Sequence, residues 1–395
     1  MGETKPQRIH LSVPHMGPNE ERYATEAFAT NWLSTVGPNL ELFEEAFRQK
    51  VGGHPCVALA SGTAALHLAL RLVGVGPGDE VVTPTLTFVA SANAVSYLGA
   101  RNVFIDSERE SWNMDPALLA SFLDERAAKG KLPKAVVVVH LYGQSADLDP
   151  ILEACRRHGV AVIEDAAEAM GTHYKGRQVG QIAELGVFSF NGNKIITTSG
   201  GGMLVAHDPA RVQKARFWSQ QARDPGIAYE HTEMGYNYRL SNVLAGIGRG
   251  QLEVLEDRVS ARRAVAFRYR DAFADLPGLT LMPQAPFGRH TNWLSVFLVD
   301  DRQLGATRDE IIAALSRADI ESRPVWKPMH LQPLHASAER IGGDVAADLF
   351  HRGICLPSSS SLTSADQERV IAVVRSVARS RSTSRAGGRG VACAS

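Results

Sequence analysis

Short apolar runs alternate with helical patterns between residues 57 and 206, and this alternation restricts the fold more than any other feature of the chain. The apolar runs, which we expect to form strands, occupy residues 57–60, 80–83, 102–105, 135–139, 160–164, 186–190 and 202–206. Helices are expected up to about residue 72, at 87–98 and at 148–157. Strands separated by helical crossovers form a mostly parallel sheet, and such sheets bind ligands beyond the carboxyl ends of their strands.

The pattern changes after about residue 251, where a long helix is expected to lead to a smaller domain. That domain should contain a strand at 293–299 and helices at 308–318 and 364–377. We therefore expect an N-terminal segment and large domain over 1–250, a small C-terminal α/β domain over 251–379, and a tail over 380–395. The tail is basic, rich in glycine and serine and poor in apolar residues, which predicts disorder.

Composition narrows the class of protein. Lys+Arg and Asp+Glu both number 42, so no overall field draws the chain to nucleic acid or anionic lipid. The cysteines, Cys56, Cys155, Cys355 and Cys393, form no C-x-x-C pair, which favours buried free thiols over metal ligation. The start has no apolar leader, and no run approaches the roughly 18 apolar residues of a membrane span. The sequence predicts a cytoplasmic protein without a metal, nucleic-acid or membrane partner.

Three motifs carry chemistry when they are taken together. Lys194 follows an apolar run, where desolvation would lower its pKa and suit it to form a Schiff base with an aldehyde cofactor. Asp165 ends a strand and could hold a pyridinium nitrogen. A helix beginning at Thr63 would offer N–H groups and its dipole to a phosphate. Each motif alone has an ordinary structural reading as a helix cap or a surface lysine, but their order along the chain indicates pyridoxal phosphate.

These motifs resemble the DegT/StrS family of pyridoxal phosphate-dependent nucleotide-sugar aminotransferases. The resemblance rests on residues 61–66, 77–84, 164–169, the Phe-Ser-Phe segment with the lysine after it, and residues 235–242, and it extends from Ile9 to about Val377. It implies the α/β fold of type I aspartate aminotransferases, with a mostly parallel central sheet, helices on both of its faces and a smaller C-terminal α/β domain. It also implies a homodimer with both active sites at the interface.

The resemblance assigns a role to each matching position. Lys194 and Asp165 would be catalytic, the first bonded to the cofactor and the second paired with its ring nitrogen. The other cofactor contacts that it implies are Gly62, Thr63 and Ser189 at the phosphate, Phe88 stacked on the ring, Glu168 beside the ring hydroxyl, and Asn237 reaching the phosphate of the partner subunit.

Within the family, residues 31–39, 191–198 and 326–333 are similar to the branch that makes amino sugars for surface glycans, which includes the bacillosamine-precursor and exopolysaccharide enzymes. This similarity suggests sugar contacts at Ser34, Thr35, Trp326 and His330. The alternatives are a self-bonded turn for the two hydroxyl residues and a packed loop with a satisfied histidine for the other two. Ser199, where many relatives have glycine, and Glu168, where others have glutamine or histidine, fit this branch.

The implied reaction moves the amino group of L-glutamate to the 4-keto carbon of a nucleotide-linked 4-keto-6-deoxyhexose, expected to be UDP-2-acetamido-2,6-dideoxy-4-hexulose. Arg239 and Lys327 are candidate cations for the diphosphate. One alternative is a GDP-linked sugar giving perosamine, and another is a 3-keto sugar. A sugar dehydratase goes with histidine in place of Lys194, and a regulator that binds the cofactor would need a DNA-binding module before the fold, so both fit this sequence less well.

Overall fold

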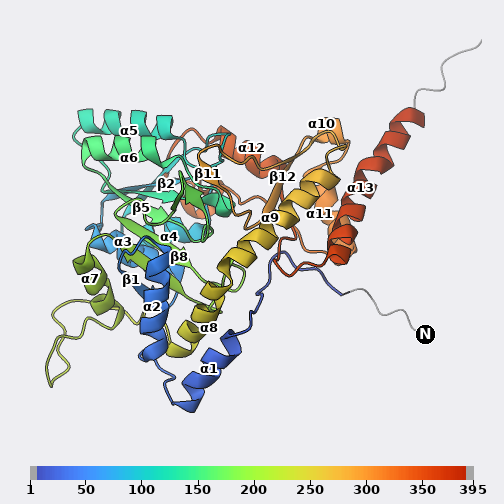
Figure 1. The fold of residues 1–395 in the computed structure, drawn as a ribbon. Helices are drawn as coiled ribbons and strands as arrows, with labels where there is room; N and C mark the ends of the chain where they lie inside the picture. The colour runs from blue at the N-terminus through green and yellow to red at the C-terminus, as the bar shows by residue number, and fades with distance from the viewer. Residues whose placement is uncertain (1–6, 388–395) are drawn as a thin grey trace, which may run out of the picture.

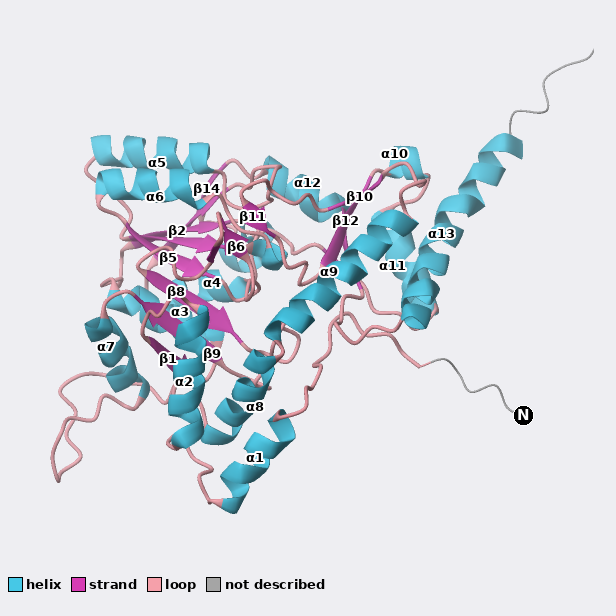
Figure 2. Cartoon of the chain, in the orientation of Figure 1, coloured by secondary structure: helices cyan, strands magenta, loops and turns pink. Residues whose placement is uncertain are grey.

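The large domain is organised around one eight-stranded sheet in a computed structural model that describes residues 7–387 (Figures 1 and 2). The strand order is β1-β9-β8-β5-β4-β2-β3-β14. β9 is antiparallel to both of its neighbours, and all the other pairs are parallel, so the expected mostly parallel sheet is confirmed. The strands are β1 (Cys56–Leu59), β2 (Glu80–Pro84), β3 (Arg101–Ile105), β4 (Ala135–Val139), β5 (Ala161–Asp165), β8 (Leu185–Ser189), β9 (Gly202–Ala206) and β14 (Glu339–Ile341).

Alternate residues of these strands enter two different cores, because successive side chains of a strand point to opposite faces of the sheet. In β1, Ala58 joins one core and its neighbours Val57 and Leu59 join the other. Helices α2, α5, α6 and α8 cover the first face, and α3, α4 and α7 cover the second. Their bounds are α2 (Pro38–Lys50), α3 (Gly62–Leu72), α4 (Val89–Tyr97), α5 (Pro116–Ala128), α6 (Leu148–His158), α7 (Pro209–Ser219) and α8 (Asn242–Glu253).

The small domain has a four-stranded antiparallel sheet in the order β10-β12-β15-β13. A separate three-stranded sheet, β11-β6-β7, joins it to the large domain. The strands are β6 (His173–Tyr174), β7 (Arg177–Gln178), β10 (Leu279–Leu281), β11 (Gly288–Arg289), β12 (Ser295–Val299), β13 (Arg323–Pro324) and β15 (Gly353–Leu356). The remaining helices are α1 (Glu20–Ala29), α9 (Leu255–Ala272), α10 (Asp301–Leu304), α11 (Arg308–Arg317), α12 (Asp344–Arg352) and α13 (Ser364–Gly387).

Each domain contains a segment from the other side of the expected boundary at residue 250. Ile9 packs in the core of the small domain with residues of α9, α11 and α13. In the other direction, β14 leaves the C-terminal half of the chain and extends the large sheet beside β3. A parallel edge strand from a distant part of the chain leaves no local sequence pattern that would indicate its pairing with β3.

The C-terminal helix is longer than expected. α13 begins at Ser364 and continues to Gly387, so residues 380–387, expected to be disordered, belong to a helix. No proline or glycine interrupts residues 364–386, and arginine and serine are tolerated in helices. Residues 388–395, the rest of the expected tail, lie outside the described residues, as does Cys393. The other three cysteines are buried free thiols, as expected.

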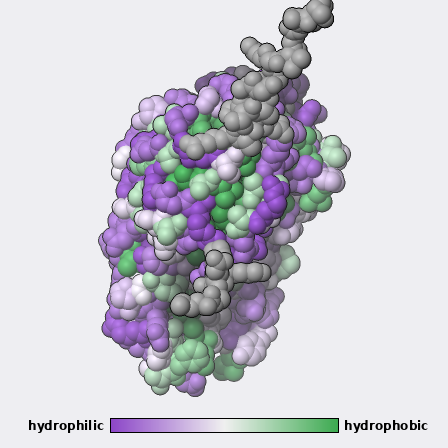
Figure 3. All heavy atoms as spheres, turned by 90° about the vertical axis from the view of Figure 1, so that its right-hand side faces the viewer, coloured by the Kyte–Doolittle hydropathy of each residue, from purple (hydrophilic) through white to green (hydrophobic). Residues whose placement is uncertain are grey.

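A membrane span requires a helix of sufficient length and hydrophobicity. Within residues 7–387, no helix is both long and apolar enough to cross a bilayer. On the face shown in Figure 3, hydrophilic residues surround a smaller area of hydrophobic ones.

Gly186 fixes how closely the turn after β7 approaches β8. A Cβ atom at residue 186 would lie 1.9 Å from the carbonyl oxygen of Gly180, a backbone atom that cannot rotate away. We expect G186A to lower the free energy of unfolding by about 3 kcal/mol, measured by urea denaturation. G76A is the matched control, since a Cβ there meets nothing within 4 Å, and its effect should stay within about 1 kcal/mol. Equal effects of the two variants would contradict this account.

Candidate active site

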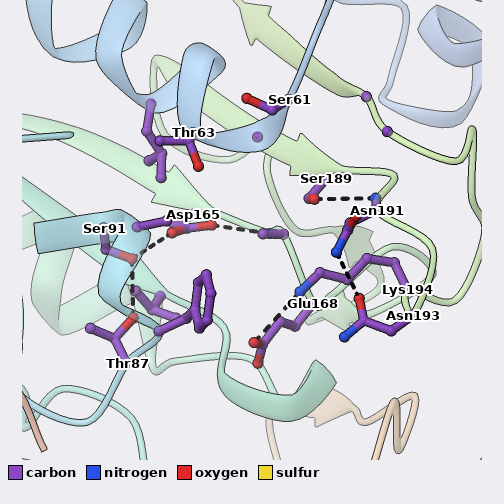
Figure 4. A pocket seen from close by; sticks show the side chains of 18 of the residues that line it. Ser61, Thr63, Thr87, Ser91, Asp165, Glu168, Ser189, Asn191, Asn193 and Lys194 are labelled. Atoms are coloured by element: carbon purple, nitrogen blue, oxygen red, sulfur yellow. Dashed lines mark hydrogen bonds and ion pairs between the residues drawn. The ribbon is translucent and has the colours of Figure 1, made fainter. Parts of the chain in front are cut away.

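A cavity of about 300 Å³ lies beyond the carboxyl ends of the parallel strands (Figure 4). This is the place where open α/β sheets bind ligands. Its lining comes from strand ends, from the first turns of α3 and α4, and from the loop after β8. The lining residues that bear polar or aromatic groups are Ser61, Thr63, Thr87, Phe88, Ser91, Asp165, Glu168, Ser189, Asn191, Asn193, Lys194 and Trp326.

Asp165 is the last residue of β5 and is 5% exposed. One of its carboxylate oxygens accepts a hydrogen bond from Ser91 Oγ at 2.8 Å, and the other accepts one from the backbone N–H of Ala167 at 3.1 Å. Ser91 Oγ also lies 3.0 Å from Thr87 Oγ1 (Figure 4). Burial raises the pKa of Asp165 above its ordinary value, and the bond from Ser91 opposes this rise. Among the described residues, no lysine or arginine lies within ion-pair distance of this carboxylate.

Lys194 extends into the same cavity from the loop after β8. Its Nζ lies 3.7 Å from Glu168 Oε1, and both side chains are largely buried. Burial lowers the pKa of Lys194, and the nearby carboxylate of Glu168 opposes that shift. Burial also raises the pKa of Glu168, whose other oxygen accepts a hydrogen bond from the backbone N–H of Tyr142 at 2.7 Å. Burial thus favours the neutral amine of Lys194 more than water does.

The first turn of α3 faces the cavity and suits an anion. Ser61 caps the helix by accepting a hydrogen bond from the N–H of Ala64 at 3.0 Å, which leaves the N–H groups of Gly62 and Thr63 without an acceptor inside the helix. A Cβ on Gly62 would lie 2.9 Å from Ser189 Cβ, so glycine is needed for β8 to approach the helix. The structure therefore brings Gly62, Thr63 and Ser189 together, as expected for a phosphate site.

Two aromatic residues line the opposite part of the cavity. Phe88 is 45% exposed although it precedes a buried helix, and its ring centroid lies 4.8 Å from that of Trp326 in an edge contact. An exposed aromatic face beside a buried carboxylate and a lysine can cover a planar ring. Trp326 is held by its backbone N–H, which donates to Tyr142 Oη at 3.0 Å.

The remaining expected site residues lie outside this cavity. His330 Nδ1 is 2.6 Å from Thr85 Oγ1, so this histidine has a partner in the large domain, directly after β2. Ser34 and Thr35 lie in the loop between α1 and α2, where the carbonyl of Ser34 accepts from the N–H of Asn242. Asn237 is exposed on the segment before α8 and does not line the cavity of its own chain.

The expectation that Arg239 supplies a cation to the cavity is wrong. Its guanidinium is buried and donates to Glu44 Oε1 at 2.6 Å and to the carbonyl of Ala58 at 2.8 Å. Glu44 is itself buried and needs this partner, since an isolated buried carboxylate is costly. Lys327 is exposed next to Trp326 and is not among the lining residues.

Comparison with known proteins identifies the family. Residues 14–375 match the model of the DegT/DnrJ/EryC1/StrS aminotransferase family. The chain belongs to this family. It is 50% identical over 93% of its length to EpsN of Bacillus subtilis, a protein named as a pyridoxal phosphate-dependent aminotransferase, and the match covers 95% of EpsN. It is 41% identical to the GDP-perosamine synthase of Caulobacter vibrioides, over 94% of this chain and 98% of that one.

The fold agrees with solved members of the DegT/DnrJ/EryC1/StrS family. The crystal structure of the aminotransferase TlmJ from Streptoalloteichus hindustanus superposes with a TM-score of 0.85 at 31% identity, covering 95% of this chain and all of TlmJ. The protein is a pyridoxal phosphate-dependent aminotransferase, and the expected fold and cofactor are confirmed.

The residues of the cavity fit pyridoxal phosphate. The Asp165 carboxylate is buried without a cationic partner and would gain one from a protonated ring nitrogen. The first turn of α3 would receive the phosphate, and Phe88 would cover the ring. Lys194, the only lysine that lines the cavity within the described residues, would bond the aldehyde carbon.

Sequence reasoning missed Ser91, whose hydroxyl donates to Asp165, and Thr87, whose hydroxyl contacts that of Ser91. Their spacing of four residues, at the start of a helix that follows a strand, is a signal that could have been used. It also missed Tyr142, which donates to Glu168. Arg262 and Trp293, which bond the lysine loop from distant parts of the chain, leave no local pattern and were missed as well.

The hydrogen bond from Ser91 opposes the rise in the pKa of Asp165 that burial causes, and its removal should show in the pH dependence of stability. In S91A the pKa of Asp165 should rise further, because burial would act without the opposing bond. A carboxyl group whose folded pKa lies above its unfolded pKa destabilises the protein progressively as pH rises from the unfolded to the folded pKa, and the full loss persists above that range. We expect S91A to lower the free energy of unfolding of cofactor-free protein by about 2 kcal/mol at neutral pH, and by less at acidic pH.

The matched control is S96A, on the same helix, where the hydroxyl donates only to the carbonyl of Ala92. Urea unfolding at the two pH values should show no pH-dependent loss for S96A. A loss in S91A that is the same at both pH values would count against the assigned role.

Proposed function

We propose that the protein transfers the amino group of L-glutamate to the 4-keto carbon of a nucleotide-linked 4-keto-6-deoxyhexose, for surface glycan or polysaccharide biosynthesis. The proposed sugar is UDP-2-acetamido-2,6-dideoxy-4-hexulose. The observation that carries the proposal is the presence of Asp165 and Lys194 in one cavity of a chain that belongs to this aminotransferase family. The cytoplasmic location stays a prediction.

The contacts of the cavity support this substrate. Asn191 and Asn193 line it with exposed carboxamides, joined by a hydrogen bond of 3.3 Å from Asn191 Nδ2 to Asn193 Oδ1. An N-acetyl group brings an amide that needs hydrogen-bond partners, and carboxamides offer both a donor and an acceptor. Trp326 supplies an apolar face next to them. Two of the three segments that resemble the amino-sugar branch thus contribute to the cavity.

The chain's own residues divide the work of amino transfer. Bound pyridoxal phosphate withdraws electrons from the carbon that loses its proton. Asp165 holds a proton on the ring nitrogen, which keeps that withdrawal strong. Lys194, as a free amine, would remove the proton at the amino-acid α-carbon and carry it to the cofactor, and its lowered pKa favours the amine form that this step requires. Glu168, 3.7 Å away, stabilises the ammonium that results.

A second candidate substrate has its own support. The 41% identity with a GDP-perosamine synthase extends over nearly the whole chain, so a GDP-linked 4-keto-6-deoxymannose is a specific alternative. That sugar carries a hydroxyl where the proposed one carries the N-acetyl group. A site built to bond an amide rejects an analogue without it by more than a difference in shape would achieve.

The substrate is tested by comparing kcat/KM for the two sugars with glutamate saturating. We expect the UDP sugar to be preferred by tenfold or more, which corresponds to about 1.4 kcal/mol at the transition state. N193A should reduce this preference, because it removes one carboxamide from the cavity. Preference for the GDP sugar would contradict the proposed substrate and leave the aminotransferase assignment intact.

We also propose that the active enzyme is a homodimer in which each subunit completes its partner's site. Asn237 is exposed on the segment that leads into α8, and the loop of Ser34 and Thr35 is attached to the start of α8. Asn242 donates from its side chain to the carbonyl of Trp32 at 2.9 Å and from its backbone to the carbonyl of Ser34. Large apolar side chains are exposed in these two regions: Phe28, Trp32, Leu33, Val36, Ile227, Tyr229 and Met234. Apolar groups gathered in this way favour a protein interface.

Mixing two inactive variants tests the shared site. In a dimer of K194A with N237A, one site lacks both residues and the other is intact, so random exchange should restore about a quarter of the wild-type sites. The control pairs K194A with a K194A/N237A double variant, whose mixed dimers have no intact site. Recovery in both mixtures, or in neither despite exchange shown by mass spectrometry, would exclude the shared site.

A further inference from the structure

The peptide next to Lys194 is held by groups from distant parts of the chain. The carbonyl of Asn193 accepts from Ser12 Oγ at 2.7 Å and from Trp293 Nε1 at 2.7 Å. The carbonyl of Lys194 accepts from Arg262 at 3.4 Å. Ser12 belongs to the N-terminal segment, Arg262 to α9, and Trp293 to the chain just before β12. None of these donors comes from the large sheet that forms the rest of the cavity.

Trp293 also contacts the reactive end of the lysine. Lys194 Nζ lies 4.1 Å from the centroid of the Trp293 ring, within the range of a cation–π interaction. The ring is 1% exposed and is packed against Tyr142, with centroids 6.3 Å apart and planes inclined by 24°. The backbone N–H of Trp293 donates to the carbonyl of Tyr142 at 3.1 Å. Trp293 is therefore fixed both by its backbone and by its ring.

Arg262 fixes Trp293 in turn. Its guanidinium is 1% exposed and donates to the carbonyls of Trp293 at 2.7 Å and Ser358 at 3.0 Å, and to Ser12 Oγ at 3.1 Å. Within the part of the chain that the structure describes, it forms no ion pair with a carboxylate. A buried guanidinium that donates to backbone carbonyls ties segments together and is costly to rearrange.

We propose that Trp293 is a positioning residue for Lys194: its indole N–H holds the Asn193 carbonyl, and its ring face holds the lysine nitrogen in the cavity. Arg262 and Ser12 complete this attachment, so the small domain and the N-terminal segment set the place of the lysine. The inference rests on the proposed role of Lys194. It goes beyond that role because it assigns the position and charge state of the amine to a residue outside the cavity lining.

The charge state of Lys194 is set by opposing influences. Burial favours the neutral amine, while Glu168 at 3.7 Å, and Asp165 farther away, favour the ammonium. The Trp293 ring attracts the ammonium and not the amine, so it adds to the effect of the two carboxylates. The Arg262 guanidinium bonds the backbone carbonyl of the lysine and not its amine. Loss of the ring should therefore lower the pKa of Lys194.

The test is competitive acetylation of the full-length, cofactor-free chain over a range of pH, with the Lys194 peptide quantified by mass spectrometry. In W293L the apparent pKa of Lys194 should fall by about one unit, and in W293F, which keeps a weaker ring, by less. W112L and W112F are matched controls, because Trp112 is equally buried in the core of the large domain, whereas it is the Trp293 ring that Lys194 contacts. Circular dichroism shows whether each variant is folded.

An unchanged or raised pKa in W293L would overturn the proposal, and so would an equal fall in W112L. Should W293L not fold, W293F against W112F decides by the same criterion. Borohydride reduction of the loaded wild-type protein, followed by peptide mapping, tests the role of Lys194 separately. A label on another lysine would contradict the proposed function, and the acetylation profile would still report whether Trp293 acts on Lys194.

Discussion

Burial of three ionisable groups in one cavity is the constraint on which the rest of the structure depends. Asp165, Glu168 and Lys194 are all largely withdrawn from water, and removing a charge from water costs several kcal/mol unless bonds replace the lost solvation. The protein supplies those bonds from fixed positions: a hydroxyl on α4 for Asp165 and a backbone N–H at Tyr142 for Glu168. Because these donors are already in place, bringing a charged ring and an amino acid into the cavity needs little reorganisation.

The alternation of the sheet explains why two neighbouring carboxylates serve different purposes. Asp165 points to the face of β5 covered by α3 and α4, where the cavity lies. Glu164 points to the other face and is completely buried there, accepting from the backbone N–H groups of Gly180, Ile182 and Ala183 and lying 3.0 Å from His140 Nε2. The Glu164 carboxylate is fully hydrogen-bonded within the fold, and the Asp165 carboxylate remains available to a ligand. A shift of one residue in the register of β5 would exchange these roles.

The sequence predicted what depends on local pattern. The seven strands expected in the large domain appear with bounds within one residue, because each is an apolar run between polar turns. Asp165, Ser189 and Lys194 were expected to meet, since strands that follow one another bring their ends to one edge. Arg239 was placed wrongly because a count of charges does not show which carboxylate a cation will find, and Glu44 lies 195 positions away. Trp293 contacts a carbonyl 100 positions away, which no periodicity indicates.

The N-terminal segment that packs in the small domain also helps to attach Lys194. Residues 7–14 leave the small domain, where Ile9 is buried, and pass the cavity so that Ser12 reaches both Asn193 and Arg262. A lysine held only by its own loop could adopt several positions, since that loop follows the sheet edge and contains glycine on both sides of the residue. Bonds from the small domain remove this freedom before any ligand binds, which reduces the entropy that binding would otherwise have to offset. The two domains are therefore parts of one site, and a boundary drawn between them at residue 250 cuts through the support of Lys194.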